Sequence, residues 1–183
     1  MWNTKSFFVI ILFFAVGSFL ACNRKTEPNN RGFRKQNSNL EESLVKANIK
    51  TVQTEESQIA DFIARYQWDM NRTGTGLQYQ VYKQGRGDTI NDGDFIVMKY
   101  STRLINGVEI YNSNELGFKE FVAGRGTVVS GLEEALLHMK QGDKAHIVIP
   151  SYLAHGLAGD GDKIPPKATI IYDIEIINVE SSK

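Results

Sequence analysis

The first apolar segment of the chain is a run from Phe7 to Ala21 that follows Lys5. A helix needs about 20 predominantly apolar residues to cross a bilayer, so this run is too short to span one comfortably. A basic residue followed by a short apolar core is typical of an export signal. We therefore expect residues 1–21 to be a signal peptide that directs the rest of the chain out of the cytoplasm.

The patterning then changes from polar to helical. Asn, Arg, Lys, Gln and Ser dominate residues 22–39, and this composition favours an irregular polar tether. Residues 40–73 predict short helices. The first of them has Leu40, Leu44 and Val45 at helical spacing.

The second of these helices carries a regular apolar stripe. Thr54 is the expected N-cap, and apolar residues follow at i, i+3, i+4 and i+7. These residues are Ile59, Phe62, Ile63 and Tyr66. Such a stripe needs a partner, which is the helix's own domain, a second copy of the chain or a bound substrate.

From Gly76 onward, short β-branched and aromatic runs alternate with Gly, Asp and Asn turns, as in an antiparallel sheet. Asn106-Gly107 is a strong hairpin signal. One amphipathic helix is expected at 131–139. The fold class is therefore α+β, with an antiparallel sheet wrapped around one short helix in a domain of residues 74–183. We expect strands near 77–83, 95–104, 109–111, 118–123, 144–149 and 169–179.

Charge and cysteine content exclude several classes of function. Lys plus Arg and Asp plus Glu each number 21, so the formal charge is zero and nothing favours a nucleic acid as partner. The single cysteine, Cys22, excludes an internal disulfide, a CxxC redox pair and a cysteine-rich zinc site.

The place of Cys22 suggests a modification. It ends the sequence Ser18-Phe19-Leu20-Ala21-Cys22, which resembles the lipobox of bacterial lipoproteins, although Phe19 and Leu20 stand where leucine and a small residue are usual. We expect lipidation of Cys22 to hold the protein on a membrane of the bacterial cell envelope, facing the periplasm. An uncleaved anchor helix and a secreted protein with one free thiol are the alternatives.

No pattern in the sequence indicates a nucleophile, a metal site or a cofactor. The histidines lack metal-ligand spacing, and Asp160-Gly161-Asp162 lacks the further carboxylates of a calcium loop. The glycine-rich turns lack the residues of a phosphate loop, and no serine lies in a nucleophile elbow. Rotation about an X-Pro bond suits this inventory because it needs no proton transfer. An apolar site with a few hydrogen bonds lowers its barrier of about 18–20 kcal/mol, which comes from lost amide resonance.

Between Leu77 and Val179 the sequence resembles the FKBP-type peptidyl-prolyl isomerases. The resemblance implies an FKBP-like fold and catalysis of proline cis/trans isomerisation. With the lipoprotein signal, the chain is similar to the gliding-motility-associated isomerase lipoproteins of Bacteroidetes. The matching segments are Val97–Tyr100 with the hairpin, Val128–Leu136, Met139–Ala145, Ile149–Gly156, Ile164–Pro166 and Ala168–Asp173.

The resemblance also implies a site for the proline ring. In the family, the backbone N–H at the position of Val129 donates to the substrate carbonyl, and a tyrosine hydroxyl at the position of His155 assists. Leu132 forms the floor. The implied catalytic residues are Tyr100, Val129, His155 and Tyr172, and the implied substrate-binding residues are Ile110, Tyr111, Phe121, Val128, Leu132 and Ile164.

Three positions depart from the family pattern. His155 replaces the tyrosine, and Leu132 replaces the tryptophan of the floor. The aspartate of the family's pocket corresponds either to Tyr111 in the ungapped register or to Asn112 after a shift of one residue. We therefore expect modest activity and poor binding of the family's macrolide inhibitors.

The leading hypothesis is a tethered isomerase that accelerates slow proline steps in exported proteins, with proline-containing polypeptides as substrates and no cofactor. The alternative is a non-catalytic chaperone or assembly factor that holds polypeptide, aided by apolar surface before Gly74. A third reading is an adaptor in a gliding or secretion complex. The N-terminal helices also offer a surface for a homodimer.

Overall fold

The computed structural model describes residues 30–181, and side-chain surroundings from residue 40 onward. The expected signal peptide and Cys22 lie outside the described residues. The chain divides into two units, Met1–Val45 and Lys46–Lys183. The packing described below is that of the second unit, which holds the sheet.

The N-terminal helical region is one continuous helix, α2, from Asn30 to Tyr66. The expectation of separate short helices was wrong, and α2 also begins inside the segment expected to be an irregular tether. No glycine or proline occurs between Leu40 and Tyr66, so nothing interrupts the helical hydrogen bonds. Thr54 is not an N-cap. Its hydroxyl donates to the carbonyl of Lys50, one turn earlier in the same helix, at 2.9 Å.

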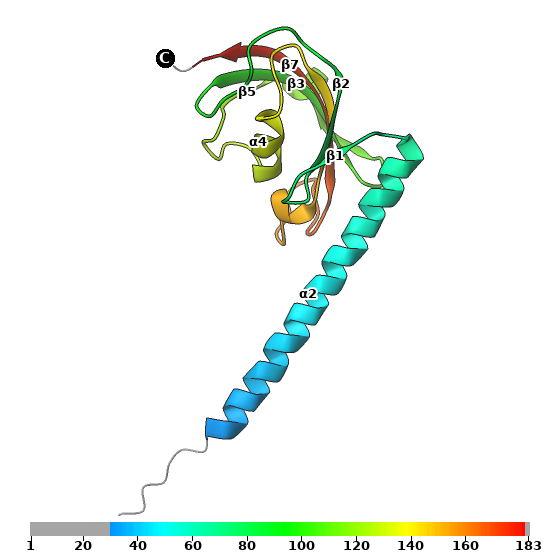
Figure 1. The fold of residues 1–183 in the computed structure, drawn as a ribbon, viewed down its shortest axis with the longest axis vertical. Coiled ribbons are helices and arrows are strands. Elements are labelled where there is room, and N and C mark those ends of the chain that lie inside the picture. Colours follow the sequence, from blue (N-terminus) through cyan, green and yellow to red (C-terminus); the bar gives the residue numbers. More distant parts are fainter. Residues whose placement is uncertain (1–29, 182–183) are drawn as a thin grey trace, which may run out of the picture. The chain divides into compact units, whose positions relative to one another are not determined.

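Seven strands form one antiparallel sheet (Figure 1). Its order is β1-β2-β6-β7-β3-β4, and β5 pairs with β3. The expected strands are all present, with ends that differ by one residue at most, whereas β1 was not expected. The strands are β1 (Asn71–Arg72), β2 (Gln78–Lys83), β3 (Phe95–Leu104), β4 (Glu109–Asn112), β5 (Lys119–Val122), β6 (Lys144–Ile149) and β7 (Ile170–Glu180).

Alternate residues of the central strands face opposite sides of the sheet. Ile147 and Ile149 of β6 belong to the main core, on what we call the inner face. Val148 lies between them and packs with Ile171 of β7 in a second cluster on the outer face. Because side chains alternate along a strand, covering both faces requires apolar residues at successive positions.

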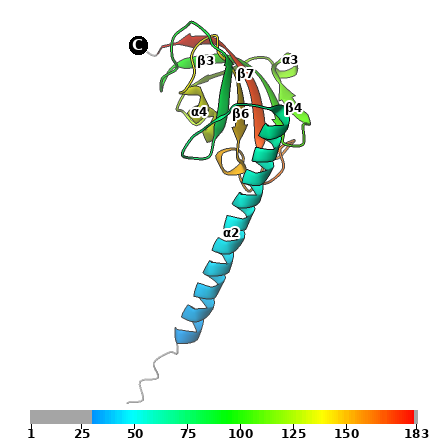
Figure 2. The same cartoon turned by 45° about the vertical axis from the view of Figure 1, so that its right-hand side comes forward.

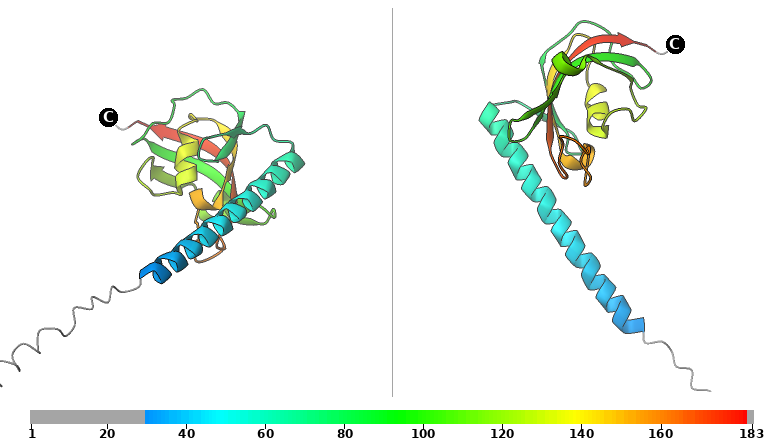
Figure 3. Two further views of the ribbon diagram at one scale, coloured as in Figure 1. Left: turned by 60° about the horizontal axis from the view of Figure 1, so that its bottom comes forward. Right: turned by 180° about the vertical axis from the view of Figure 1, so that it is seen from behind.

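The inner face of the sheet packs on helix α4 (Ser130–Leu136), and Figure 3 shows the sheet curving around this helix. Helix α4 is shorter than the expected 131–139. Its buried Leu132 belongs to the main core. Gly131 lies so close to Ile149 that a Cβ atom there would collide with Cγ2 of that side chain. A glycine is therefore required where α4 meets β6.

The C-terminal part of α2 packs on part of the outer face (Figure 2). Ile59 and Phe62 from the predicted stripe are buried and pack with Val148 and Ile171. Of the three partners considered for the apolar stripe, the helix's own domain is therefore the one that Ile59 and Phe62 contact. Tyr66 remains 44% exposed.

Two further short helices were not expected from the sequence. Helix α3 (Ser113–Leu116) follows β4, and a 3-10 turn, η1 (Ser151–Leu153), follows β6. Helix α3 lies beside β3 and β4, which carry predicted site residues.

Candidate functional site

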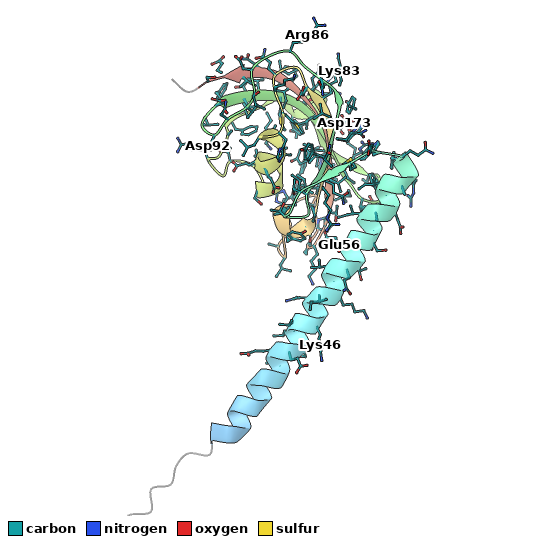
Figure 4. All side chains as sticks on the ribbon, viewed as in Figure 1. Lys46, Glu56, Lys83, Arg86, Asp92 and Asp173 are labelled. Atoms are coloured by element: carbon teal, nitrogen blue, oxygen red, sulfur yellow. The ribbon has the colours of Figure 1, made fainter. Side chains whose placement is uncertain are left out.

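The predicted site residues come from seven places in the chain, and nine of the ten share one hydrophobic cluster. They lie on β3, β4, β5, α4 and β7 and in the loops before α4 and β7, and Figure 4 shows the side chains between the sheet and α4. The residues of the cluster that are buried are Ile110, Phe121, Leu132, Ile164 and Tyr172, and those that are partly buried are Tyr100, Tyr111, Val128 and Val129.

Two tyrosines face each other in this cluster. The ring centroids of Tyr100 and Tyr172 are 6.4 Å apart, with an angle of 49° between the ring planes. Burial raises the pKa of both phenols above the ordinary value, since the charged form is disfavoured away from water. Both hydroxyls therefore stay protonated at neutral pH and keep their ability to donate a hydrogen bond.

Val129 lies immediately before α4, with extended backbone angles (φ −61°, ψ 145°). Its carbonyl accepts from the N–H groups of Leu132 and Glu133 at 2.9 and 3.2 Å. Its own N–H has no acceptor among the described residues. The group can thus donate to a ligand without breaking a bond of the fold.

Tyr111 ties the edge of the site to the loop that precedes β7. Its hydroxyl donates to Oδ2 of Asp160 at 2.6 Å and to Oδ2 of Asp162 at 3.2 Å. The other oxygen of Asp160 accepts from the N–H groups of Asp162 and Ile164 at 2.9 and 2.8 Å. Asp160 therefore fixes both the turn and the position of Ile164, one of the predicted binding residues.

The same hydrogen bonds shift two pKa values in opposite directions. The bond to Asp160 is the main reason why the pKa of Tyr111 is raised to about 12. Partial burial raises the pKa of Asp160, but the bonds from Tyr111 and two backbone N–H groups lower it overall, with a contribution from the charge of His155. Asp160 is thus a firm acceptor at neutral pH.

Sequence reasoning missed Asp160, since its Asp-Gly-Asp stretch indicated only a turn. The aspartate position of the family corresponds to Tyr111 or to Asn112, and the structure gives the Asn112 side chain a separate role. The Asn112 side chain accepts from the N–H groups of Asn114 and Glu115 at 3.0 Å each and so caps α3. The absence of an acid at both Tyr111 and Asn112 was the one feature of the sequence that could have drawn attention to a carboxylate elsewhere.

His155 lies in the loop after η1 and is partly buried. The N–H of Gly156 donates to the carbonyl of Ser151 at 2.8 Å, and the N–H of Lys167 donates to the carbonyl of Gly156 at 2.7 Å. These bonds fix the loop backbone beside His155. Its side chain makes no hydrogen bond with any described residue.

A cavity of about 600 Å³ lies apart from these residues. It is formed by α2, the turn after β3 and the segment before β7. None of the predicted site residues lines the cavity. Its lining includes Ala47, Thr51, Glu55, Ile105, Pro165 and Ala168.

Two other kinds of site were sought in the described part of the chain. No group of three or more His, Cys, Asp or Glu side chains there could hold a metal ion. None of the helices it contains is long and apolar enough to cross a membrane.

Comparison with known proteins shows which family the sheet-forming part of the chain is similar to. Residues 87–177 match the FKBP-type peptidyl-prolyl cis-trans isomerases. The chain is 39% identical over 108 residues to the FKBP-type peptidyl-prolyl cis-trans isomerase FkpA of Escherichia coli, covering 59% of this chain and 39% of that relative. The chain therefore spans about two fifths of the length of the curated relative that it matches.

Solved structures show the same similarity. The crystal structure of FkpA from Escherichia coli superposes with a TM-score of 0.63 at 25% identity, covering 100% of this chain and 84% of that one. A peptidyl-prolyl cis-trans isomerase from Pseudomonas syringae superposes with a TM-score of 0.62 at 26% identity, covering 72% of this chain and 95% of the other. The expected α+β fold of FKBP type is thereby confirmed.

Proposed function

The chain belongs to the FKBP-type peptidyl-prolyl cis-trans isomerase family, and we propose on that basis that it catalyses rotation about X-Pro bonds in polypeptides. The observation that supports this most strongly is an apolar cluster with two aromatic rings close to a backbone N–H that is available as a hydrogen-bond donor. Tyr100, Tyr172 and Leu132 belong to one hydrophobic cluster, in which the two rings are 6.4 Å apart. The N–H of Val129, immediately before α4, has no acceptor within residues 30–181.

The proposed mechanism needs only binding and hydrogen bonding. The proline ring lies among Tyr100, Tyr172 and Leu132, where water is excluded. Twisting the amide localises its nitrogen lone pair and removes resonance, so apolar surroundings favour the twisted state over the planar one. The N–H of Val129 and the ring of His155 donate to carbonyls of the substrate, and bonds that are stronger in the twisted state lower the barrier.

The test compares two substitutions at Val129. Its φ of −61° fits proline, and its N–H has no acceptor in the described part of the chain, so we expect Val129→Pro to remove the donor with little effect on folding. Val129→Ala trims the side chain but keeps the donor. We expect residues 22–183 with Cys22→Ser to accelerate isomerisation of a Leu-Pro peptide, and Val129→Pro to lose about tenfold or more of that acceleration, the effect of losing about one net hydrogen bond.

Val129→Ala is expected to lose much less than Val129→Pro. Equal losses in the two variants would remove the proposed role of the N–H. A folded wild-type chain without any acceleration would refute the isomerase proposal and favour a holding function instead.

A second candidate function, the holding of unfolded polypeptide, is favoured by the cavity of about 600 Å³. It lies away from the proposed proline site, so it can bind chain without catalysis. Ala47→Trp should fill part of it and weaken protection of a proline-free client from aggregation. Asn48→Trp, at the next position on α2 and outside the cavity lining, is the control. Equal protection by both variants contradicts this function.

We also propose that the protein is anchored through a lipid on Cys22 in the bacterial cell envelope, with residues 74–183 as the isomerase domain facing the periplasm. The support is the lipobox-like sequence before Cys22. Labelling of cells with a radioactive fatty acid should mark the wild-type protein and leave Cys22→Ser unlabelled. Service to gliding motility is a further proposal, and a deletion strain that glides normally would contradict it.

A homodimer is proposed through α2. Five of its apolar side chains are 39–58% exposed, a large share for one helix. Sedimentation of residues 22–183 at rising concentration should show a dimer that Ile49→Lys dissociates. A monomer at every concentration would refute it. The five residues are Leu40, Leu44, Val45, Ile49 and Val52.

A further inference from the structure

Strand β5 directs a lysine toward the inner face of the sheet. In its antiparallel pairing with β3, Lys119 is opposite Met98, and Phe121 is opposite Ile96. Residues directly opposite each other in such a pair point to the same face. Met98, Ile96 and Phe121 are all buried in the main core. Lys119 therefore points to the face that carries the proposed proline site, whereas its neighbour Glu120 is exposed.

The ammonium group of Lys119 lies against an aromatic wall of that site. Its Nζ is 5.6 Å from the centroid of the Tyr100 ring, within the range of a cation–π interaction. Lys119 is half-buried, and this burial lowers its pKa because a charged amine is less stable away from water. The site is thus bounded on this side by a cation that has lost part of its hydration.

No described carboxylate lies within 4.0 Å of Lys119. Lys144, on the same sheet, shows the usual arrangement for a lysine of comparable exposure. Its Nζ is 2.8 Å from a carboxylate oxygen of Glu175. Asp160 and Asp162, the acids that contact Tyr111 of the proposed site, accept from its hydroxyl. A partly desolvated ammonium without an anion is costly, and an anionic ligand would offset that cost.

We propose that Lys119 binds a carboxylate of the client polypeptide, so that the preferred X-Pro bonds are flanked by Asp or Glu. This proposal rests on the proposed isomerase function and adds a substrate class to it. Lys119 lies beside the Tyr100 ring, which we propose contacts the proline. The carboxylate that Lys119 binds should therefore belong to the residue immediately before or immediately after the proline. The bound carboxylate gives Lys119 an ion pair that no described residue of the chain supplies.

The experiment uses residues 22–183 with Cys22→Ser and matched peptides with Glu or Gln immediately before or immediately after the proline. For the wild type, kcat/KM should be about three- to fivefold higher for the Glu peptide at one of the two positions, as expected for a partly exposed ion pair. The preference should shrink as salt is added. Lys119→Met should reduce the Glu-to-Gln ratio to about one.

Lys99→Met is the matched control. Lys99 lies on β3 next to Tyr100 but is exposed, so its removal changes net charge equally without touching the site. We expect the control to keep the Glu preference. A ratio of one in the wild type at both positions overturns the proposal, and so does a preference that survives Lys119→Met.

Binding of the same peptides by calorimetry separates this proposal from the isomerase function. If no peptide is isomerised but the Glu peptide binds better through Lys119, the catalytic proposal fails and carboxylate recognition stands. If the Gln peptide is isomerised but Glu gives no gain in rate or affinity, catalysis stands and the role of Lys119 is refuted.

Discussion

Two carboxylates attach the same segment, 151–169, to the rest of the domain, one at its ends and one at its tip. Glu55 of α2 holds the ends. It accepts from the Ser151 N–H at 2.6 Å, the Ser151 hydroxyl at 3.0 Å and the Thr169 hydroxyl at 2.6 Å. Asp160 holds the tip through the Tyr111 hydroxyl of β4 at 2.6 Å.

The two attachments differ in depth and hence in what they do. Glu55 is only 9% exposed, so its hydrogen bonds are made away from water and losing them is expensive. Asp160 lies nearer the surface, beside the proposed proline site. The buried attachment therefore secures the fold of the segment, whereas the outer one sets the position of Ile164 and the surroundings of His155.

The largest effect is expected when the buried attachment is broken. Glu55→Ala leaves the Ser151 N–H and two hydroxyls without an acceptor in the interior, which should lower the free energy of unfolding by about 3 kcal/mol. Urea denaturation of residues 22–183 measures this. Glu56→Ala is the control, since Glu56 pairs with Arg72 at the surface, where such pairs contribute about 0–1 kcal/mol. Similar losses in both variants would refute the structural role of Glu55.

A smaller effect, on activity more than on stability, is expected when the outer attachment is broken. Tyr111→Phe removes the hydroxyl that donates to Asp160 and Asp162, so the loop with Ile164 is held less firmly. We expect kcat/KM for a Leu-Pro peptide to fall about fivefold, while the free energy of unfolding falls by less than about 1 kcal/mol.

The control for Tyr111→Phe is Tyr82→Phe on the outer face. Tyr82 also donates to an aspartate, Asp173, at 3.0 Å, but it is not part of the proposed site. Its replacement should leave kcat/KM unchanged. An equal loss of activity in both variants would mean that Tyr111 acts only through general stability.

The contrast also explains what the sequence could and could not predict. The strands were predictable because alternation and turn residues such as Asn106-Gly107 are local signals. Local signals also misled, because Thr54 has the side chain of an N-cap but lies inside α2, bonded to Lys50. The helix continues through Thr54 because the residues on both sides of it are compatible with a helix.

Neither attachment could be read from local patterns. Glu55 is 96 residues from Ser151 and 114 from Thr169, and on the helix it resembled an ordinary acidic residue of a first turn. Tyr111 and Asp160 are 49 residues apart. The apolar residues of the predicted site were named through family resemblance, whereas the polar contacts that are particular to this chain depend on pairing across the fold.

The smallest expected effect is a difference in how two tyrosines titrate. The pKa of both Tyr111 and Tyr82 is raised to about 12, against about 10 for a free phenol. The largest cause of the raised pKa differs between the two tyrosines. For Tyr111 the hydrogen bond to Asp160 is the largest, whereas for Tyr82 burial comes first and Asp173 second. Asp173 lies among the side chains of the sheet (Figure 4).

Each tyrosine favours the folded state while it is protonated, because its pKa is higher when folded than when unfolded. Its contribution to stability is therefore complete below about pH 10 and is lost as the pH rises through about 12. Asp160→Asn should return the pKa of Tyr111 most of the way to its ordinary value. Asp173→Asn should lower that of Tyr82 by less, since burial remains. Titration by ultraviolet absorbance, with Tyr111→Phe and Tyr82→Phe to assign the signals, tests this order, and equal shifts would show that the two phenols are held in the same way.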